Sequence, residues 1–281
     1  MGVIGLERIV DTIKRHQRIH RAARKARFAI GRVVPPRRFA EIPGRVHFND
    51  FMFLNSSPQE IASYAERARN VIALIEESLA AAEKTTDDMD RWLDFGCGYG
   101  RVVRFLAQRV PPERIFVSDV VKEGVDFCSS EFGVHPVYSQ AELDCVSLGS
   151  FDFIYAISVI THLNERNSIA FLRLLGESLN DGGIALFTTH GQWSIENAAL
   201  YGPEYEARRT EIAASVEERG IAYLSYPFAT DDYGMTWHSK EYIETKMAEL
   251  HGSRVVPLMF RAHALDGHQD VHAFQRVERS V

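Results

Sequence analysis

Between residues 91 and 189, short apolar runs alternate with longer stretches in which apolar residues recur at helical spacing. Short apolar runs suit buried strands, and the stretches between them suit amphipathic helices. Strands that alternate with helices in this way are typical of a parallel α/β sheet. We predict strands at 91–95, 114–118, 135–138, 151–157 and 183–189. We predict helices between them at 100–109, 121–132 and 165–179.

The segments on either side of this region also carry helix and strand signals. Ser57 followed by Pro58 resembles an N-cap with proline in the first turn, and predicts a helix to about Ala82. The run Asn180-Asp181-Gly182-Gly183 predicts a helix stop and a turn before the fifth strand. Close spacing predicts that the last two strands pair antiparallel. The predicted C-terminal elements are a helix near 239–250 and strands at 253–261 and 270–277.

Charge separates the N-terminal segment from the rest of the chain. Residues 3–30 have the pattern of a basic amphipathic helix. Residues 1–46 hold twelve basic and three acidic residues, a balance of +9, so the remainder carries −15 of the net charge of −6. We therefore expect a basic helical N-terminal extension over 1–48 and a main domain over 49–281. The extension would contact an anionic membrane surface, a second subunit or the acidic main domain.

Composition narrows the class of protein. Apolar residues make up 46% of the 281 and charged residues 25%, as in ordinary globular proteins. Three cysteines without CxxC spacing (Cys97, Cys128 and Cys145) argue for a reducing compartment, and against a disulfide framework or a zinc site. No apolar run approaches the roughly 18 residues of a membrane span. We expect a soluble, cytoplasmic protein without a metal, peripheral at the membrane if the basic extension binds lipid.

The stretch "DFGCGYGR", from Asp94 to Arg101, lies where the first predicted strand meets the first helix. Open α/β sheets bind ligands at this place. A dinucleotide fingerprint would have glycine or alanine where Arg101 stands. A carboxylate at position 94 would also repel a pyrophosphate, but it would attract an ammonium or a sulfonium. These features favour S-adenosylmethionine over NAD.

Four segments in order carry a family resemblance: "LDFGCGYGR", "VSDV", "FDFIYAISVITHL" and "LNDGGIALFTTHG". They resemble the motif series of class I S-adenosylmethionine-dependent methyltransferases of the small-molecule type. The resemblance implies a Rossmann-like, doubly wound α/β sheet of about seven strands, mostly parallel with an antiparallel last strand. N-terminal helices and a lid insertion would complete the methyltransferase domain, 49–281.

The resemblance also implies which residues bind S-adenosylmethionine. The glycine motif would wrap its methionine part, Asp119 would bind the ribose hydroxyls, and Val120 would lie beside the adenine. Gln140 stands where the family usually has an aspartate. The segment before the first strand often closes over the cofactor, which makes Asp50, Phe51 and Phe53 secondary candidates. The implied cofactor residues are Asp94, Gly96, Cys97, Gly98, Gly100, Asp119, Val120, Gln140, Ala141, Ala156 and Ile157.

Three histidines are candidate bases for taking a proton from the methyl acceptor. His162 follows the fourth predicted strand and His190 the fifth, where strand ends face the ligand crevice. His238 lies in a polar and aromatic stretch before a helix, where it would otherwise serve only at the helix entry. Their spacing is not that of a metal site.

A stretch of 48 residues, from 190 to 237, connects a predicted strand to a predicted helix. Such connections usually have about 2 to 6 residues, so we expect a lid over the acceptor. Its many aromatic residues suit a sugar-bearing or aromatic small molecule, or the core of a compact subdomain. We expect a small-molecule or glycoconjugate acceptor, with O-methylation preferred over N-methylation. The alternatives are a non-catalytic S-adenosylmethionine-binding or scaffold protein, and an RNA methyltransferase that uses the basic helix. The acidic main domain makes nucleic acid the less favoured acceptor.

Overall fold

The computed structural model describes residues 22, 25–26, 29–31, 33–226 and 232–277. Most of the helix predicted over 3–30 lies outside these residues. No helix among those described combines the length and the apolar content needed to cross a membrane.

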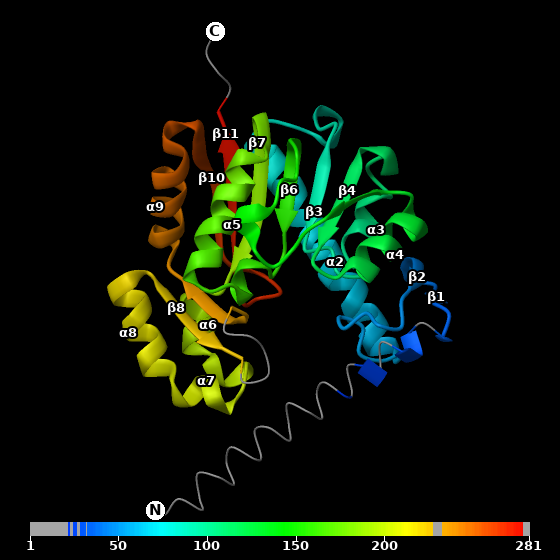
Figure 1. Ribbon diagram of the computed structural model, residues 1–281, viewed down its shortest axis with the longest axis horizontal. Helices are drawn as coiled ribbons and strands as arrows, with labels where there is room; N and C mark the ends of the chain where they lie inside the picture. Colours follow the sequence, from blue (N-terminus) through cyan, green and yellow to red (C-terminus); the bar gives the residue numbers. More distant parts are fainter. Residues whose placement is uncertain (1–21, 23–24, 27–28, 32, 227–231, 278–281) are drawn as a thin grey trace, which may run out of the picture.

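A seven-stranded sheet forms the centre of the molecule, in the order β10-β11-β7-β6-β3-β4-β5 (Figure 1). Every strand is parallel to its neighbours except β11, which runs antiparallel between β7 and β10. The predicted Rossmann-like sheet with an antiparallel last strand is confirmed. The strands are β3 (Trp92–Phe95), β4 (Ile115–Asp119), β5 (His135–Tyr138), β6 (Phe151–Ala156), β7 (Leu179–Thr189), β10 (Val255–Leu265) and β11 (Gln269–Arg276).

Helices cover both faces of this sheet because neighbouring strand residues point to opposite sides. Trp92 belongs to the core under α2, α3 and α4, whereas Leu93 belongs to the core under α5 and α9. The predicted cap of α2 is confirmed, since Ser57 Oγ accepts a hydrogen bond from the Glu60 N–H at 3.2 Å. The helices are α2 (Pro58–Ala81), α3 (Val103–Leu106), α4 (Lys122–Phe132), α5 (Glu165–Glu177) and α9 (Lys240–His251).

Two local predictions were wrong. The helix predicted over 100–109 is α-helical only in α3, because the flanking turns use shorter i→i+3 bonds such as Gln108 N–H to Phe105 O. The run from Asn180 to Gly183 is not a turn between elements, because β7 already begins at Leu179. These residues bulge from β7, where the pairing with β6 jumps from Leu179 to Ile184.

An N-terminal hairpin, β1 (Arg37–Phe39) and β2 (Ile42–Val46), lies inside the segment that we predicted to be helical. It packs on the main core through Ile42 and Val46. Buried Arg104 on α3 donates to the carbonyl oxygens of Pro43 at 3.1 Å and Arg45 at 3.0 Å. Charged groups are rarely buried without partners, so these bonds fix the hairpin against α3.

The predicted lid region folds as a small unit beside the carboxyl ends of β6 and β7. Its own apolar core includes Tyr205, Ile212 and Trp237. The sequence did not indicate its antiparallel strand pair, β8 and β9. Its elements are α6 (Gln192–Glu196), α7 (Pro203–Ala207), α8 (Arg209–Arg219), β8 (Ile221–Ser225) and β9 (Gly234–His238).

Candidate active site

The glycine loop, residues 96–101, joins β3 to the turn before α3. Gly96 and Gly98 have φ angles of +87° and +53°, a region that residues with a Cβ rarely adopt. A Cβ on Gly96 would lie 2.4 Å from Val159 Cγ2, so the loop after β6 packs directly on the glycine loop. A Cβ on Gly98 would meet no atom within 4 Å. The loop is therefore fixed on one side and open to a ligand at Gly98.

Asp94 lies beneath this loop and is only 4% exposed. Burial raises the pKa of its carboxyl from 3.8 to about 7, and the adjacent Tyr155 phenol offsets part of that shift. Within the described part of the chain, no basic side chain forms an ion pair with Asp94. A buried carboxylate without a cation is costly in the free protein, and it would be stabilised by a cationic ligand.

Asp119, at the end of β4, contacts the same loop. Its Oδ2 accepts from the Gly98 N–H at 2.8 Å, and its Oδ1 accepts from the Val121 N–H at 2.8 Å. Burial raises the pKa of Asp119, while hydrogen bonds from backbone N–H groups lower it. The carboxylate thus steadies both the loop and the start of α4, and it would remain able to accept further hydrogen bonds.

The other proposed cofactor residues take different positions. Val120 is 60% exposed and Gln140 and Ala141 are also exposed, on segments that follow the neighbouring strands β4 and β5. Ala156 and Ile157 lie at the end of β6, the first buried and the second half-buried.

The Cys97 side chain is buried in the core under the loop. Its thiol and that of Cys128 lie 3.6 and 3.9 Å from the Gly98 carbonyl oxygen. The contact with Cys128 and burial raise the pKa of Cys97 well above its usual range, so both side chains act as packing groups under the loop.

A short segment before α2 packs against the glycine loop. The His47 ring stacks on the Tyr99 ring at 4.7 Å, and Asn49 Nδ2 donates to the Tyr99 hydroxyl at 2.9 Å. Of the secondary candidates, Asp50 is buried and accepts from the Tyr64 hydroxyl at 2.7 Å. Phe53 packs on the main core, whereas Phe51 is exposed. Asn49 was missed because its partner lies fifty residues along the chain.

Taken together, these residues fit S-adenosylmethionine. Two buried or half-buried carboxylates, Asp94 and Asp119, form no ion pair among the described residues, although the charge of Arg101 lowers the pKa of Asp94. The cofactor offers an ammonium, a sulfonium and two ribose hydroxyls. The loop leaves open space at Gly98, and the exposed apolar side chain of Val120 is suited to an adenine face.

His162 and His190 lie at the carboxyl edge of the sheet, and both are held by strand β9. His162 Nδ1 lies 3.1 Å from the Gly234 carbonyl oxygen, and His190 Nδ1 lies 3.2 Å from the Thr236 carbonyl oxygen. A carbonyl can only accept, so these contacts favour a proton on each Nδ1 and a lone pair on each Nε2. The Tyr226 hydroxyl oxygen, 3.0 Å from His162 Nδ1, can accept the same proton. Burial lowers both pKa values, that of His190 to about 3.

His238 does not join these two side chains. It ends β9 with a side chain only 1% exposed, and within the described residues neither ring nitrogen has a hydrogen-bond partner. Burial lowers its pKa to about 3.

Three polar residues at this edge were not identified from the sequence. Ser158 follows β6 with a φ of +57°, which is strained for a residue with a Cβ. Its hydroxyl donates to Gln269 Oε1 at 3.1 Å, and Asp270 follows in the same strand. Gln269 and Asp270 reach this edge only because β11 runs antiparallel to β7, which the local sequence does not reveal.

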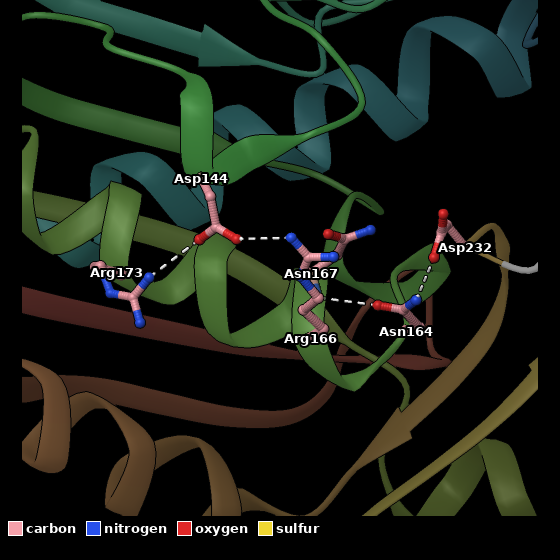
Figure 2. A network of polar contacts seen from close by, with 6 residues as sticks. All are labelled: Asp144, Asn164, Arg166, Asn167, Arg173 and Asp232. Atoms are coloured by element: carbon pink, nitrogen blue, oxygen red, sulfur yellow. Dashed lines mark hydrogen bonds and ion pairs between the residues drawn. The ribbon is translucent and has the colours of Figure 1, made fainter.

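Asn164 connects the lid to the sheet domain (Figure 2). Its Oδ1 caps α5 by accepting from the Asn167 N–H at 2.9 Å, and its Nδ2 donates to Asp232 Oδ1 at 2.7 Å. Nearby, Asp144 joins Arg166 and Arg173 on α5. The histidine contacts with β9 and this amide contact place the lid against the turn after β6.

Comparison with known proteins agrees with this geometry. No curated protein matches the chain. Among solved structures, magnesium protoporphyrin IX methyltransferase from Synechocystis PCC 6803, with bound SAH, superposes with a TM-score of 0.51 at 13% identity, over 79% of this chain and 90% of that one. An amino pentose methyltransferase from Micromonospora echinaspora, with bound SAM, gives 0.50 at 15% identity, over 80% and 99%.

A family model also matches the sequence. The family is described as a methyltransferase domain, and the match spans residues 64–223, which is more than half of the chain and includes the glycine loop, Asp119 and His162. The chain therefore belongs to the methyltransferase-domain family, with the Rossmann-like fold of the class I S-adenosylmethionine-dependent methyltransferases.

Proposed function

We propose that this chain methylates a hydroxyl group of a small molecule or glycoconjugate, with S-adenosylmethionine as methyl donor and His162 as base. The observation that carries the proposal is the position of His162 Nδ1, which lies 3.1 Å from the Gly234 carbonyl oxygen and 3.0 Å from the Tyr226 hydroxyl oxygen. A proton on Nδ1 satisfies both oxygens and leaves the Nε2 lone pair to accept a proton. The ring is half-buried and lies three residues after Val159, which packs on Gly96 of the glycine loop.

His162 suits this role better than the other two histidines. At neutral pH its lowered pKa leaves the ring uncharged and able to accept a proton. His190 has a pKa of about 3 and would be a weaker base. His238 is buried on both ring nitrogens.

The bound cofactor supplies a methyl group on a sulfonium, already activated for in-line displacement. Asp94 and Asp119 would hold its cationic and ribose groups. His162 Nε2 would take the proton of the acceptor hydroxyl as the new oxygen–methyl bond forms and the sulfur–methyl bond breaks. The rings of Tyr226 and Tyr233, 5.9 and 5.3 Å from that of His162, would exclude water from this step.

Replacing His162 tests the proposal. With methyl-labelled cofactor and the small-molecule fraction of a cell lysate, we expect His162→Ala to lower kcat by about 10²–10⁴ with cofactor affinity unchanged. His135→Ala is the matched control, since that exposed ring begins β5, at the amino end of the strand, and contacts the Glu113 carbonyl oxygen and the Phe116 ring. Full activity of His162→Ala would remove the base from the mechanism, and cofactor binding without label transfer by the wild type would indicate a non-catalytic protein.

A further inference from the structure

Asp270 stands at the acceptor end of the sheet although it belongs to the last strand. Its register partner in β7 is Thr189, so it lies beside His190 and Gly191. A Cβ on Gly191 would lie only 1.8 Å from Asp270 Oδ2, which shows that the carboxylate occupies the space over that glycine. A residue with a side chain at 191 would displace it.

One oxygen of this carboxylate has no partner. Asp270 is 8% exposed, and its Oδ1 accepts from the His263 N–H at 2.7 Å. Its Oδ2 forms no hydrogen bond or ion pair within residues 33–226 and 232–277. Burial raises the pKa of Asp270. An asparagine would satisfy the His263 N–H equally well without a buried charge, so the backbone contact does not explain the carboxylate.

The surroundings of Asp270 are polar, and His263 is the titratable neighbour whose charge lowers the pKa of Asp270. The Tyr201 ring lies 5.1 Å from the His190 ring, and its hydroxyl donates to Ser194 Oγ at 2.9 Å. Ser194 Oγ in turn donates to the His268 carbonyl oxygen at 2.7 Å. The described residues place no lysine or arginine in contact with this carboxylate, so Asp270 is the charge that an acceptor would meet here.

We propose that Asp270 anchors the methyl acceptor by accepting a hydrogen bond from a second hydroxyl or an ammonium group next to the methylated hydroxyl. This inference rests on the proposed function and narrows its acceptor. A carboxylate only accepts hydrogen bonds and repels anions, so the acceptor is a polyol, sugar or amino sugar rather than an acid or a phosphate.

The test uses the small-molecule fraction of a lysate, separated by ion exchange into cationic, neutral and anionic pools and incubated with methyl-labelled cofactor. For the wild type we expect at least tenfold more label in the neutral and cationic pools than in the anionic pool. For Asp270→Asn, which keeps the shape and the His263 bond, we expect at least a tenfold rise in KM for the active pool, with kcat within threefold. The wild-type KM should fall as pH rises and Asp270 ionises, and that pH dependence should disappear in the variant.

A second variant and two controls keep these outcomes distinct. Gly191→Ala displaces the carboxylate and should reproduce the rise in KM, whereas Gly149→Ala, in open space away from the site, should not. Cofactor affinity and the melting temperature of Asp270→Asn should equal or exceed those of the wild type, and a lower melting temperature with lost cofactor affinity would show a structural role instead. Label mainly in the anionic pool, or an unchanged KM in Asp270→Asn, refutes the anchor alone. No label from the wild type in any pool refutes the proposed function as well.

Discussion

Replacement of Asp94 by asparagine should stabilise the ligand-free protein while weakening cofactor binding. The folded-state pKa of about 7 lies above the unfolded value of 3.8, so the native state holds the proton more tightly. The stabilising contribution of Asp94 is therefore complete below pH 3.8 and is lost as pH rises through about 7. Each pH unit between 5 and 7 removes about 1.4 kcal/mol, which gives about 3 kcal/mol between pH 5 and pH 8.5.

Chemical denaturation of the wild type and Asp94→Asn at pH 5 and pH 8.5 measures this effect directly. The variant has no titrating group at this position, so its stability advantage over the wild type should grow by about 3 kcal/mol across that range. An advantage that stays constant with pH would show that Asp94 titrates normally, and would refute the inference from its burial.

Cofactor binding should change in the opposite direction. Calorimetry of the wild type at pH 5 and pH 8.5 should show affinity rising with pH, because the ionised carboxylate attracts the cationic cofactor. Asp94→Asn should bind at least tenfold more weakly than the wild type at pH 8.5 and show little pH dependence. Equal affinity in both proteins would remove Asp94 from the cofactor site.

Three further predictions concern other parts of the fold. Gly98→Val should lower cofactor affinity at least tenfold, whereas Gly149→Val, at a glycine that also has a positive φ (+86°), should lose only stability. Equal affinities of the two variants would refute a ligand at Gly98. The pKa of His238 is about 3, below its unfolded value of 6.5, so its contribution to stability is present above pH 6.5 and lost as pH falls. His238→Leu should therefore lessen the loss of stability between pH 6.5 and 5 by about 2 kcal/mol. An unchanged pH slope of stability would contradict this. Removing residues 1–33 spares the 37–46 hairpin and should leave cofactor affinity unchanged. It should abolish salt-sensitive sedimentation with anionic vesicles. Equal sedimentation of the full and shortened proteins would refute a membrane role.

Much of the sheet could be predicted because its signals are local. Runs such as 151–157 and the cap at Ser57 depend on neighbouring residues, so strand order along the chain and the start of α2 were accessible. The N-terminal hairpin was not, since its position depends on Arg104, about sixty residues away. The lid strands were also missed, because each has only five residues and their pairing is not a local signal.

The same difference between local and long-range signals applies to the cofactor and acceptor ends of the candidate site. The proposed cofactor residues from Asp94 to Asp119 lie close in sequence, so a resemblance carried over one motif at a time could suggest them. The proposed acceptor end brings together Ser158, His190 and Asp270 through the antiparallel insertion of β11. Local sequence contains no signal for that register, so Asp270 emerged only with the structure.

The late insertion of β11 also bears on how the polypeptide is made. Until β11 leaves the ribosome, β7 exposes an unpaired hydrogen-bonding edge, although nearly all eleven of its residues are buried in the finished molecule. An open edge of this kind pairs readily with other chains. The lid, α9 and β10 must all be synthesised while the edge of β7 is still unpaired. Slow translation at low temperature or a chaperone should therefore raise the soluble yield. A stop codon before Gln269 should give aggregates rather than a half-active enzyme.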